Sequence, residues 1–197
     1  MKVLAQTPPL LTNRFERALV FATRAHAGQL KKGTSVPYAA HILGVASLVL
    51  DAGGDEDLAI AAVLHDVVED CGGDDRRREI LSAFGPRVAH VVEGCTDTEE
   101  VPKPPWRKRK EEYIRHLQTA DADTRLVSAA DKLYNARLIL ADYREIGDAV
   151  FERFSGKREG TLWYYRALVG EFRHGKRNRL TDELERVVIE LERLAGD

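Results

Sequence analysis

Nearly every segment of this chain carries apolar residues at the spacing of an α-helix, and no segment alternates with period two for long enough to predict a strand. Glycine and proline signals, such as Gly85-Pro86, separate the helices that we expect. The pattern therefore predicts an all-α bundle with short connections. The expected helices cover about residues 13–25, 37–52, 55–72, 75–84, 86–94, 106–118, 123–142, 158–173 and 181–195.

Local signals indicate where the first three helices begin and end. Asn13, with Glu16 three residues later, resembles a capping box, so we expect the first helix to begin there. Pro37 suits the first turn of the second helix, because proline lacks the N–H that has no partner at that position anyway. The third helix is expected to run without a break from Asp55 to Gly72.

Length and composition limit the class of protein. A chain of 197 residues can form one sizeable core and is short for two, so we expect a single domain over residues 1–197, with the main motifs in 12–140 and C-terminal helices in 145–197 packed on it. With a net charge of −2, the chain has no global field that attracts nucleic acid or an anionic membrane, and we expect neither as a partner. The sequence has no signal peptide, no membrane-spanning stretch and no disulfide framework, which favours a cytoplasmic protein.

Two polar residues interrupt the third apolar segment. Between residues 58 and 68 the side chains that are not hydrocarbon are those of His65 and Asp66, and apolar residues lie on every side of the helix. Such a helix is buried. Because an uncompensated buried carboxylate is strongly destabilising, Asp66 must be paired, protonated or bound to a cation.

Two other predicted helices repeat this feature. Asp131 lies in the apolar segment "RLVSAADKLYNARLIL", with Asn135 one turn further on the same face, and His41 is a single imidazole in "PYAAHILGVASLVL". Each residue alone also fits a hydrogen-bonded position in a core. Together, His41, His65, Asp66 and Asp131 form a mixed nitrogen and oxygen ligand set that predicts a divalent first-row metal: manganese, iron or zinc.

The order of these residues resembles the HD-domain metal-dependent phosphohydrolases, whose pattern is a histidine, a His-Asp dyad and a distant aspartate. More narrowly, the chain resembles the hydrolase domain of the RelA/SpoT homologues in its stand-alone form, the small alarmone hydrolases. The resemblance spans about residues 12–140. It rests on the motifs "HAGQ" at 26–29, "KK" at 31–32, "PYAAH" at 37–41, "LHDVVED" at 64–70, "FG" at 84–85, Thr96 and "ADKLYN" at 130–135.

The resemblance implies an all-α HD-type fold, manganese at the four metal positions, and a role for Glu69 and Asp70 in handling the attacking water. It also implies the reaction, in which the 3′-pyrophosphate of guanosine tetra- or pentaphosphate is hydrolysed and pyrophosphate is released. Residue chemistry agrees, because a bound divalent metal lowers the pKa of its water and polarises a phosphoryl oxygen. Either Glu69 or Asp70 could then accept the remaining proton.

Basic residues near these motifs are candidates for binding the purine nucleotide substrate, because phosphoryl transfer needs positioning and charge neutralisation. The resemblance puts Lys31 and Lys32 beside the nucleotide. Lysine stands at 31 where an arginine is commoner in the family, and Leu138 stands where relatives often carry a polar residue that contacts the base, so guanosine and adenosine alarmones both remain possible substrates. The rest of the expected substrate-binding set is Lys103, Arg107, Tyr134 and Asn135.

Two other functions compete with this hypothesis. Another HD-type nucleotide phosphohydrolase, such as a nucleotidase or phosphodiesterase, would share the metal ligands. The other is a non-catalytic nucleotide sensor, or a helical scaffold that kept the metal only for folding. A purely structural metal site would have no use for the acid pair Glu69 and Asp70.

Overall fold

The computed structural model describes residues 10–98, 102–174 and 177–196. Within these ranges the structure consists of helices and loops, and its one β-type contact is an isolated bridge between Leu30 and Pro37. The prediction of an all-α fold is confirmed. The helices are α1 (Asn13–Ala25), α2 (Ala39–Asp51), α3 (Glu56–Leu64), α4 (Val67–Cys71), α5 (Gly73–Phe84), α6 (Pro86–Cys95), α7 (Trp106–Thr119), α8 (Ala122–Ile146), the 3-10 helix η1 (Gly147–Arg153), α9 (Lys157–His174) and α10 (Arg179–Gly196).

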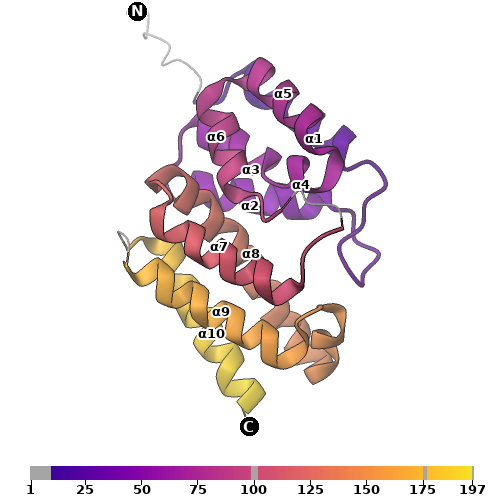
Figure 1. Ribbon diagram of the computed structural model, residues 1–197, viewed down its shortest axis with the longest axis vertical. Coiled ribbons are helices and arrows are strands. Elements are labelled where there is room, and N and C mark those ends of the chain that lie inside the picture. The colour runs from indigo at the N-terminus through magenta and orange to yellow at the C-terminus, as the bar shows by residue number, and fades with distance from the viewer. Residues whose placement is uncertain (1–9, 99–101, 175–176, 197) are drawn as a thin grey trace, which may run out of the picture.

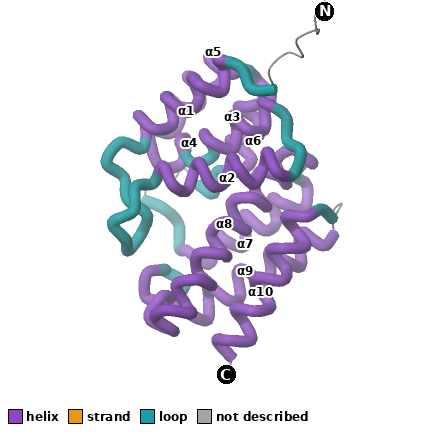
Figure 2. The backbone as a smooth tube through the Cα atoms, turned by 180° about the vertical axis from the view of Figure 1, so that it is seen from behind, coloured by secondary structure: helices purple, strands orange, loops and turns teal. Residues whose placement is uncertain are grey.

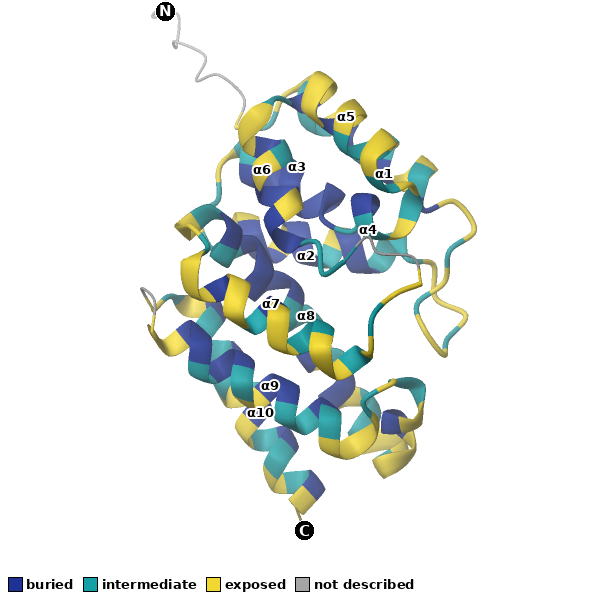
Figure 3. Ribbon diagram, in the orientation of Figure 1, coloured by how far each residue is buried: buried dark blue, intermediate teal, exposed yellow. Residues whose placement is uncertain are grey.

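Two helices organise the bundle. Every residue of α3 from Leu58 to Leu64 is buried, and this helix packs against α1, α2 and α6. Figure 3 shows α3 in dark blue along most of its length. The long helix α8 packs against α2, α6, α10 and η1, and so it connects the N-terminal helices to the C-terminal ones. A helix that is apolar on every side needs neighbours on every side, which explains why α3 is central.

The molecule is elongated, with α5 and α6 towards one end of the long axis and the C-terminal end of α10 at the other (Figure 1). The loop between α1 and α2 and the segment that leads into α7 lie on the same side of the molecule (Figure 2). None of the helices in the described ranges is long and apolar enough to span a membrane.

Two predicted helix starts need correction. The residue that caps α1 is Thr12, whose hydroxyl accepts a hydrogen bond from the backbone N–H of Arg14, so the predicted capping box at Asn13 does not form. The second helix begins at Ala39 and not at Pro37. Pro37 instead opens a tight turn, in which its carbonyl accepts from the N–H of Ala40.

The predicted continuous helix over 55–72 is also wrong, because it divides into α3 and α4 at His65 and Asp66. Asp66 has φ −98° and ψ −3°, which opens the helix locally, although the N–H of Asp70 still donates to the carbonyl of Asp66 at 2.9 Å. The dyad therefore lies at the junction between the buried helix α3 and the short helix α4.

Candidate active site

His65 is held by the backbone of its own helix. Its ring is 1% exposed, and Nδ1 lies 2.8 Å from the carbonyl oxygen of Ala62. A carbonyl only accepts hydrogen bonds, so Nδ1 must carry the proton and donate it. Nε2 is thereby left to face the site with its lone pair when the ring is neutral, as a metal ligand requires.

The other predicted ligands converge on this nitrogen. Nε2 of His41, from α2, lies 3.1 Å from Nε2 of His65. Oδ2 of Asp66 lies 3.2 Å from the His41 nitrogen and 3.0 Å from the His65 nitrogen. Oδ1 of Asp131, from α8, lies 3.4 and 3.8 Å from the same two nitrogens. The bend after α3, together with α2 and α8, thus brings all four predicted ligands to one point.

Tyr38 supports this cluster, although it is not among the site residues that the sequence predicted. Its hydroxyl donates a hydrogen bond to Asp66, and its ring packs on that of His41 with centroids 5.1 Å apart. Burial, followed by the negative charge of Asp66, raises the pKa of the Tyr38 phenol, so the hydroxyl remains a donor at any physiological pH. The available signal was the spacing in "PYAAH", which puts Tyr38 three residues before His41 and on the same side of the helix start.

Asp131 has partners of its own. Its Oδ2 accepts from Nζ of Lys132 at 2.5 Å, and its Oδ1 accepts from Nδ2 of Asn135 at 2.6 Å. Burial raises the pKa of this carboxyl, but the charges of Lys132 and of the histidines outweigh it, so the pKa lies below its usual range. Asp131 is therefore ionised at neutral pH, as a metal ligand must be.

The chemistry of these donors fits a divalent cation. Ligand atoms of His41, His65 and Asp66 lie within 4.8 Å of one another, in a setting where the two rings are buried. Two ionised carboxylates and two imidazole nitrogens in so small a volume need a shared positive charge. Burial lowers the pKa of His65, but the charges of Asp66 and Asp131 outweigh burial and raise this pKa well above its usual value, which reflects the negative charge gathered at this point.

The first acid beside this centre, Glu69, is fully engaged. Its Oε1 accepts from Nζ of Lys103 at 2.9 Å, and its Oε2 accepts from the backbone N–H of Asp97 at 3.1 Å. The Asp97 carboxylate is only 7% exposed and pairs with Arg109 and Lys110 at the start of α7. Lys103, which the sequence predicted as a substrate contact, is thus a partner of Glu69 in this structure.

The second acid, Asp70, is exposed and held through one oxygen. Nε2 of Gln29 donates to Oδ2 of Asp70 at 2.9 Å. In the described part of the chain, Oδ1 of Asp70 has no hydrogen-bonding partner. The two acids therefore differ, because Glu69 uses both oxygens and Asp70 keeps one available.

Comparison with known proteins identifies the family of this chain. The profile of the HD domain family matches residues 18–162, a segment that contains all four predicted ligands. The chain belongs to the HD domain family. In an HD domain, a cluster of histidine and aspartate side chains such as this one binds a divalent metal ion.

Several relatives of this HD-domain chain carry the same functional name. It is 38% identical over 120 residues to the guanosine-3′,5′-bis(diphosphate) 3′-pyrophosphohydrolase MESH1 of Danio rerio, and the match covers 59% of this chain and 64% of that protein. It is 37% identical over 134 residues to the guanosine-3′,5′-bis(diphosphate) 3′-pyrophosphohydrolase of Aquifex aeolicus, covering 66% of this chain and 18% of that one. The chain thus spans less than two thirds of these relatives.

Solved structures share the fold. A metazoan orthologue of SpoT, described as hydrolysing ppGpp, superposes with a TM-score of 0.75 at 24% identity, over 94% of this chain and 98% of that one. A Listeria monocytogenes protein superposes with a TM-score of 0.69 at 26% identity, over 80% of this chain and 99% of that one. The HD-type helical architecture therefore extends through nearly the whole chain.

Two adjoining cavities open beside the HD-domain centre. The first, of about 270 Å³, has Tyr38 and His41 in its wall, together with the predicted substrate contacts Lys31, Lys32 and Asn135. The second, also of about 270 Å³, is lined by Trp106 and by cations of α7. The residues common to both cavities are Lys32, Ile139, Phe154 and Tyr165.

Three predicted substrate contacts line neither of these cavities: Lys103, which pairs with Glu69, Arg107 and Tyr134. The guanidinium of Arg107 lies 3.2 Å from the ring centroid of Trp163 on an exposed part of α7. The ring of Tyr134 packs on His41, and its hydroxyl donates to the carbonyl of Ala40 at 3.0 Å. The cations that line the second cavity are instead Lys32, Arg109 and Lys110. Helical spacing separates Arg107 from Lys110 by three residues but does not say which of them faces the cavity.

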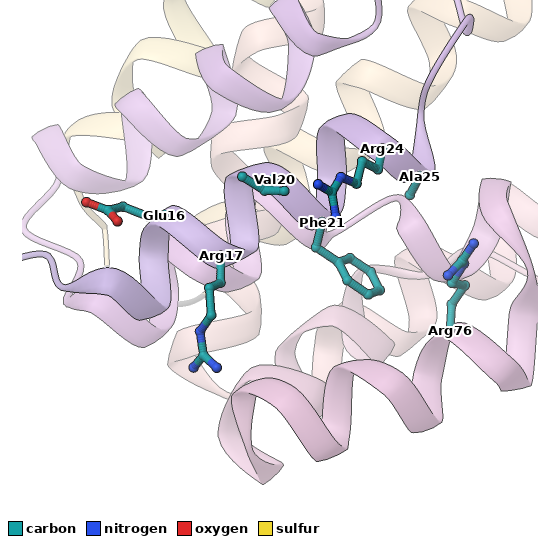
Figure 4. A pocket seen from close by; sticks show the side chains of 7 residues that line it. All are labelled: Glu16, Arg17, Val20, Phe21, Arg24, Ala25 and Arg76. Atoms are coloured by element: carbon teal, nitrogen blue, oxygen red, sulfur yellow. The ribbon is translucent and has the colours of Figure 1, made fainter.

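A cavity of greater volume than these two lies elsewhere, between α1 and α5 (Figure 4). It has a volume of about 510 Å³ and is lined by Phe21 and three arginines, Arg17, Arg24 and Arg76. None of the predicted metal, catalytic or substrate-binding residues lines it. Size alone therefore does not identify the active site of this protein.

Proposed function

We propose that this HD-domain protein hydrolyses the 3′-pyrophosphate of guanosine tetra- or pentaphosphate, or of the adenosine counterparts, and releases pyrophosphate. The observation that carries the proposal is the convergence of His41, His65, Asp66 and Asp131 beside a cavity that also contains Lys31 and Lys32. The names of the relatives from Danio rerio and Aquifex aeolicus support the same reaction.

In this proposal His41, His65, Asp66 and Asp131 hold the metal, with manganese as our choice and iron or zinc as substitutes. When bound, such a metal lowers the pKa of a water molecule and polarises a phosphoryl oxygen. Tyr38 and the carbonyl of Ala62 orient the ligands Asp66 and His65.

Asp70 is our choice for the group that accepts a proton from the attacking water. A general base needs a free lone pair within reach of the proton that it removes. Oδ1 of Asp70 has no partner in the described ranges, whereas both oxygens of Glu69 accept hydrogen bonds from Lys103 and Asp97. Glu69 then holds Asp97 and Lys103 beside the site.

The cations beside the centre have the placement that a polyphosphate substrate needs. Lys31 and Lys32 lie in a loop that precedes α2, and Lys32 lines both cavities. We assign these two lysines and Asn135 to substrate binding, and add Arg109 and Lys110 for the second cavity. Lys103 contributes through Glu69, while Arg107 and Tyr134 support neighbouring aromatic residues.

The test is a manganese-supplemented assay that compares guanosine and adenosine 3′-pyrophosphates and identifies the product. We expect pyrophosphate from at least one of them, and its loss in the His65→Ala variant. Orthophosphate or a nucleoside monophosphate as product would favour another HD-type phosphohydrolase. Nucleotide binding by calorimetry without turnover of any purine 3′-pyrophosphate would overturn the enzyme proposal and favour a sensor.

A further inference from the structure

The motif "HAGQ" at residues 26–29 has no part in the proposed reaction, although its Gln29 holds Asp70. α1 ends at Ala25, and the N–H of Gln29 donates to the carbonyl of His26 at 3.0 Å, so the chain reverses within four residues. Gly28 makes this reversal possible, because its φ of +80° is a conformation that favours glycine. The turn places the side chains of His26 and Gln29 in contact.

The chemistry of the partners fixes the orientation of the Gln29 amide. Oδ2 of Asp70 lies 2.9 Å from one end of the amide, and Nδ1 of His26 lies 2.7 Å from the other. The ionised carboxylate of Asp70 only accepts hydrogen bonds, so the NH₂ end must face it. The amide oxygen then faces His26, and Nδ1 of His26 must carry a proton to donate.

The hydrogen bond from His26 to Gln29 leaves the other ring nitrogen of His26 unpaired. Its ring is 4% exposed, and its Nε2 is buried without a hydrogen-bonding partner in the described part of the chain. An unpaired buried polar atom is destabilising, so an apolar residue here would be the more stable choice. An apolar residue could not donate a hydrogen bond to Gln29, whereas Nδ1 of His26 can.

This unit also adjoins the metal ligands. The ring of Tyr38 packs on His26 with centroids 4.8 Å apart and on His41 at 5.1 Å, and the N–H of Tyr38 donates to the backbone carbonyl of Gln29 at 2.9 Å. Gln29 therefore connects to Asp70 through its side chain and to Tyr38 through its backbone. The turn at residues 26–29 therefore connects Asp70, the proposed proton acceptor, to Tyr38, which donates to Asp66.

We propose that Gln29 is a positioning residue that fixes Asp70 with one carboxylate oxygen free, and that His26 fixes the orientation of Gln29. The proposal rests on the proposed function, because it assigns Asp70 to the attacking water. It predicts that Gln29 acts on turnover only through Asp70.

A double-mutant cycle tests this dependence in the full chain loaded with manganese. Gln29→Met keeps the length of the side chain and removes both hydrogen bonds, and we expect kcat to fall about 10–100-fold with KM and metal content unchanged. In the Asp70→Ala background, Gln29→Met should lower kcat no further. An equal fall in both backgrounds would show that Gln29 acts elsewhere, and the proposal would be wrong.

The matched control is Gln118→Met. Gln118 also donates from its amide to a carboxylate, that of Glu171 at 3.3 Å, in contact with neither the acids nor the predicted ligands. We expect kcat of Gln118→Met to equal that of the wild type. A fall equal to that of Gln29→Met would mean that any such loss slows the enzyme, which would overturn the proposal.

His26 variants test the second half of the proposal. Asparagine puts an amide nitrogen at the same number of bonds from Cβ as Nδ1, whereas glutamine puts it one bond further away. We therefore expect His26→Asn to recover most of the kcat that His26→Gln loses. The reverse order would contradict a donor at the Nδ1 position.

A measurement independent of activity separates this proposal from the proposed function. Nitrogen-15 NMR of the metal-free full chain should find the His26 proton on Nδ1, and this signal should shift in Gln29→Met. A neutral ring with its proton on Nε2 would overturn the positioning proposal even if the enzyme is active. A protein that releases no pyrophosphate but keeps the Nδ1 proton would instead overturn the proposed function and leave the geometry of Gln29 intact.

Discussion

The backbone N–H of Asp97 donates a hydrogen bond of 3.1 Å to the carboxylate of Glu69. The side chain of the same aspartate pairs with Arg109 and Lys110 on α7. One residue thus joins the acid after the dyad to the helix that lines the second cavity. The two regions are far apart in sequence, and this contact makes their positions depend on each other.

Replacing Asp97 by alanine should therefore affect both stability and turnover. The change leaves Arg109 and Lys110 half-buried without their counter-charge, and breaking such a pair destabilises by about 3–5 kcal/mol when fully buried. We expect a loss of a few kcal/mol in the free energy of unfolding, measured in urea, and a lower kcat/KM. The control Asp182→Ala removes an exposed arginine contact and should change stability by less than about 1 kcal/mol.

Gly44 on α2 lies against the ring of Tyr134. A Cβ atom at this residue would lie 2.0 Å from Cε2 of Tyr134, so Gly44→Ala must displace a ring that packs on His41. We expect a loss of about 1–3 kcal/mol and weaker manganese binding. Gly170→Ala on α9 is the control, because nothing lies within 4 Å of its Cβ position and helix propensity should make it neutral or stabilising.

Tyr38→Phe removes the hydroxyl that donates to Asp66 and keeps the ring that packs on His26 and His41. Partners that orient a metal ligand typically change affinity about 10–100-fold when they are removed. We therefore expect the manganese dissociation constant to rise by about that factor, measured by calorimetry. Tyr143→Phe, which loses a hydrogen bond to the carbonyl of Leu194, should leave this constant unchanged.

Manganese binding should strengthen as pH rises. In the metal-free protein, burial lowers the pKa of His65, but the negative charges of Asp66 and Asp131 outweigh it and raise the pKa well above its usual value. The ring is then protonated at neutral pH, and that proton must leave before Nε2 can bind the metal. The dissociation constant should fall about tenfold per pH unit for one proton released. Calorimetry in buffers of different ionisation enthalpy counts this proton, and a pH-independent affinity would contradict the assignment.

Both cysteines should react slowly with thiol reagents in the folded protein. Burial, and then the charge of Asp70, raises the pKa of Cys71 to about 11, and burial raises that of Cys95 to about 11. At pH 8 only about one thiol in a thousand is then ionised, and the thiolate is the species that reacts. We expect alkylation to be about a hundredfold slower than in the urea-unfolded chain. Rapid labelling of Cys71 in the folded state would show that burial and Asp70 do not raise the pKa of its thiol.

Much of the fold follows from local pattern. The apolar spacing predicted nearly every helix, because burial of one helical face depends on residues three and four apart. The bend at His65 and Asp66 was not predicted, since the apolar residues of α3 before it are followed at once by Val67 and Val68 after it, without a glycine or proline between them. Nothing in the spacing of apolar residues distinguishes a straight buried helix from one that bends at a polar pair.

For the site, the sequence by itself determined which residues are anomalous: carboxylates and imidazoles in buried helices must find compensating charge wherever the chain folds. The tertiary structure decided which partners they have. Gln29 donates a hydrogen bond to Asp70, which lies 41 positions further along the chain, and Tyr38 donates to Asp66, which lies 28 positions further. Such contacts depend on the path of the loop between α1 and α2 and on how α2 and α3 cross. Helical periodicity describes one helix at a time, so it contains no information about either.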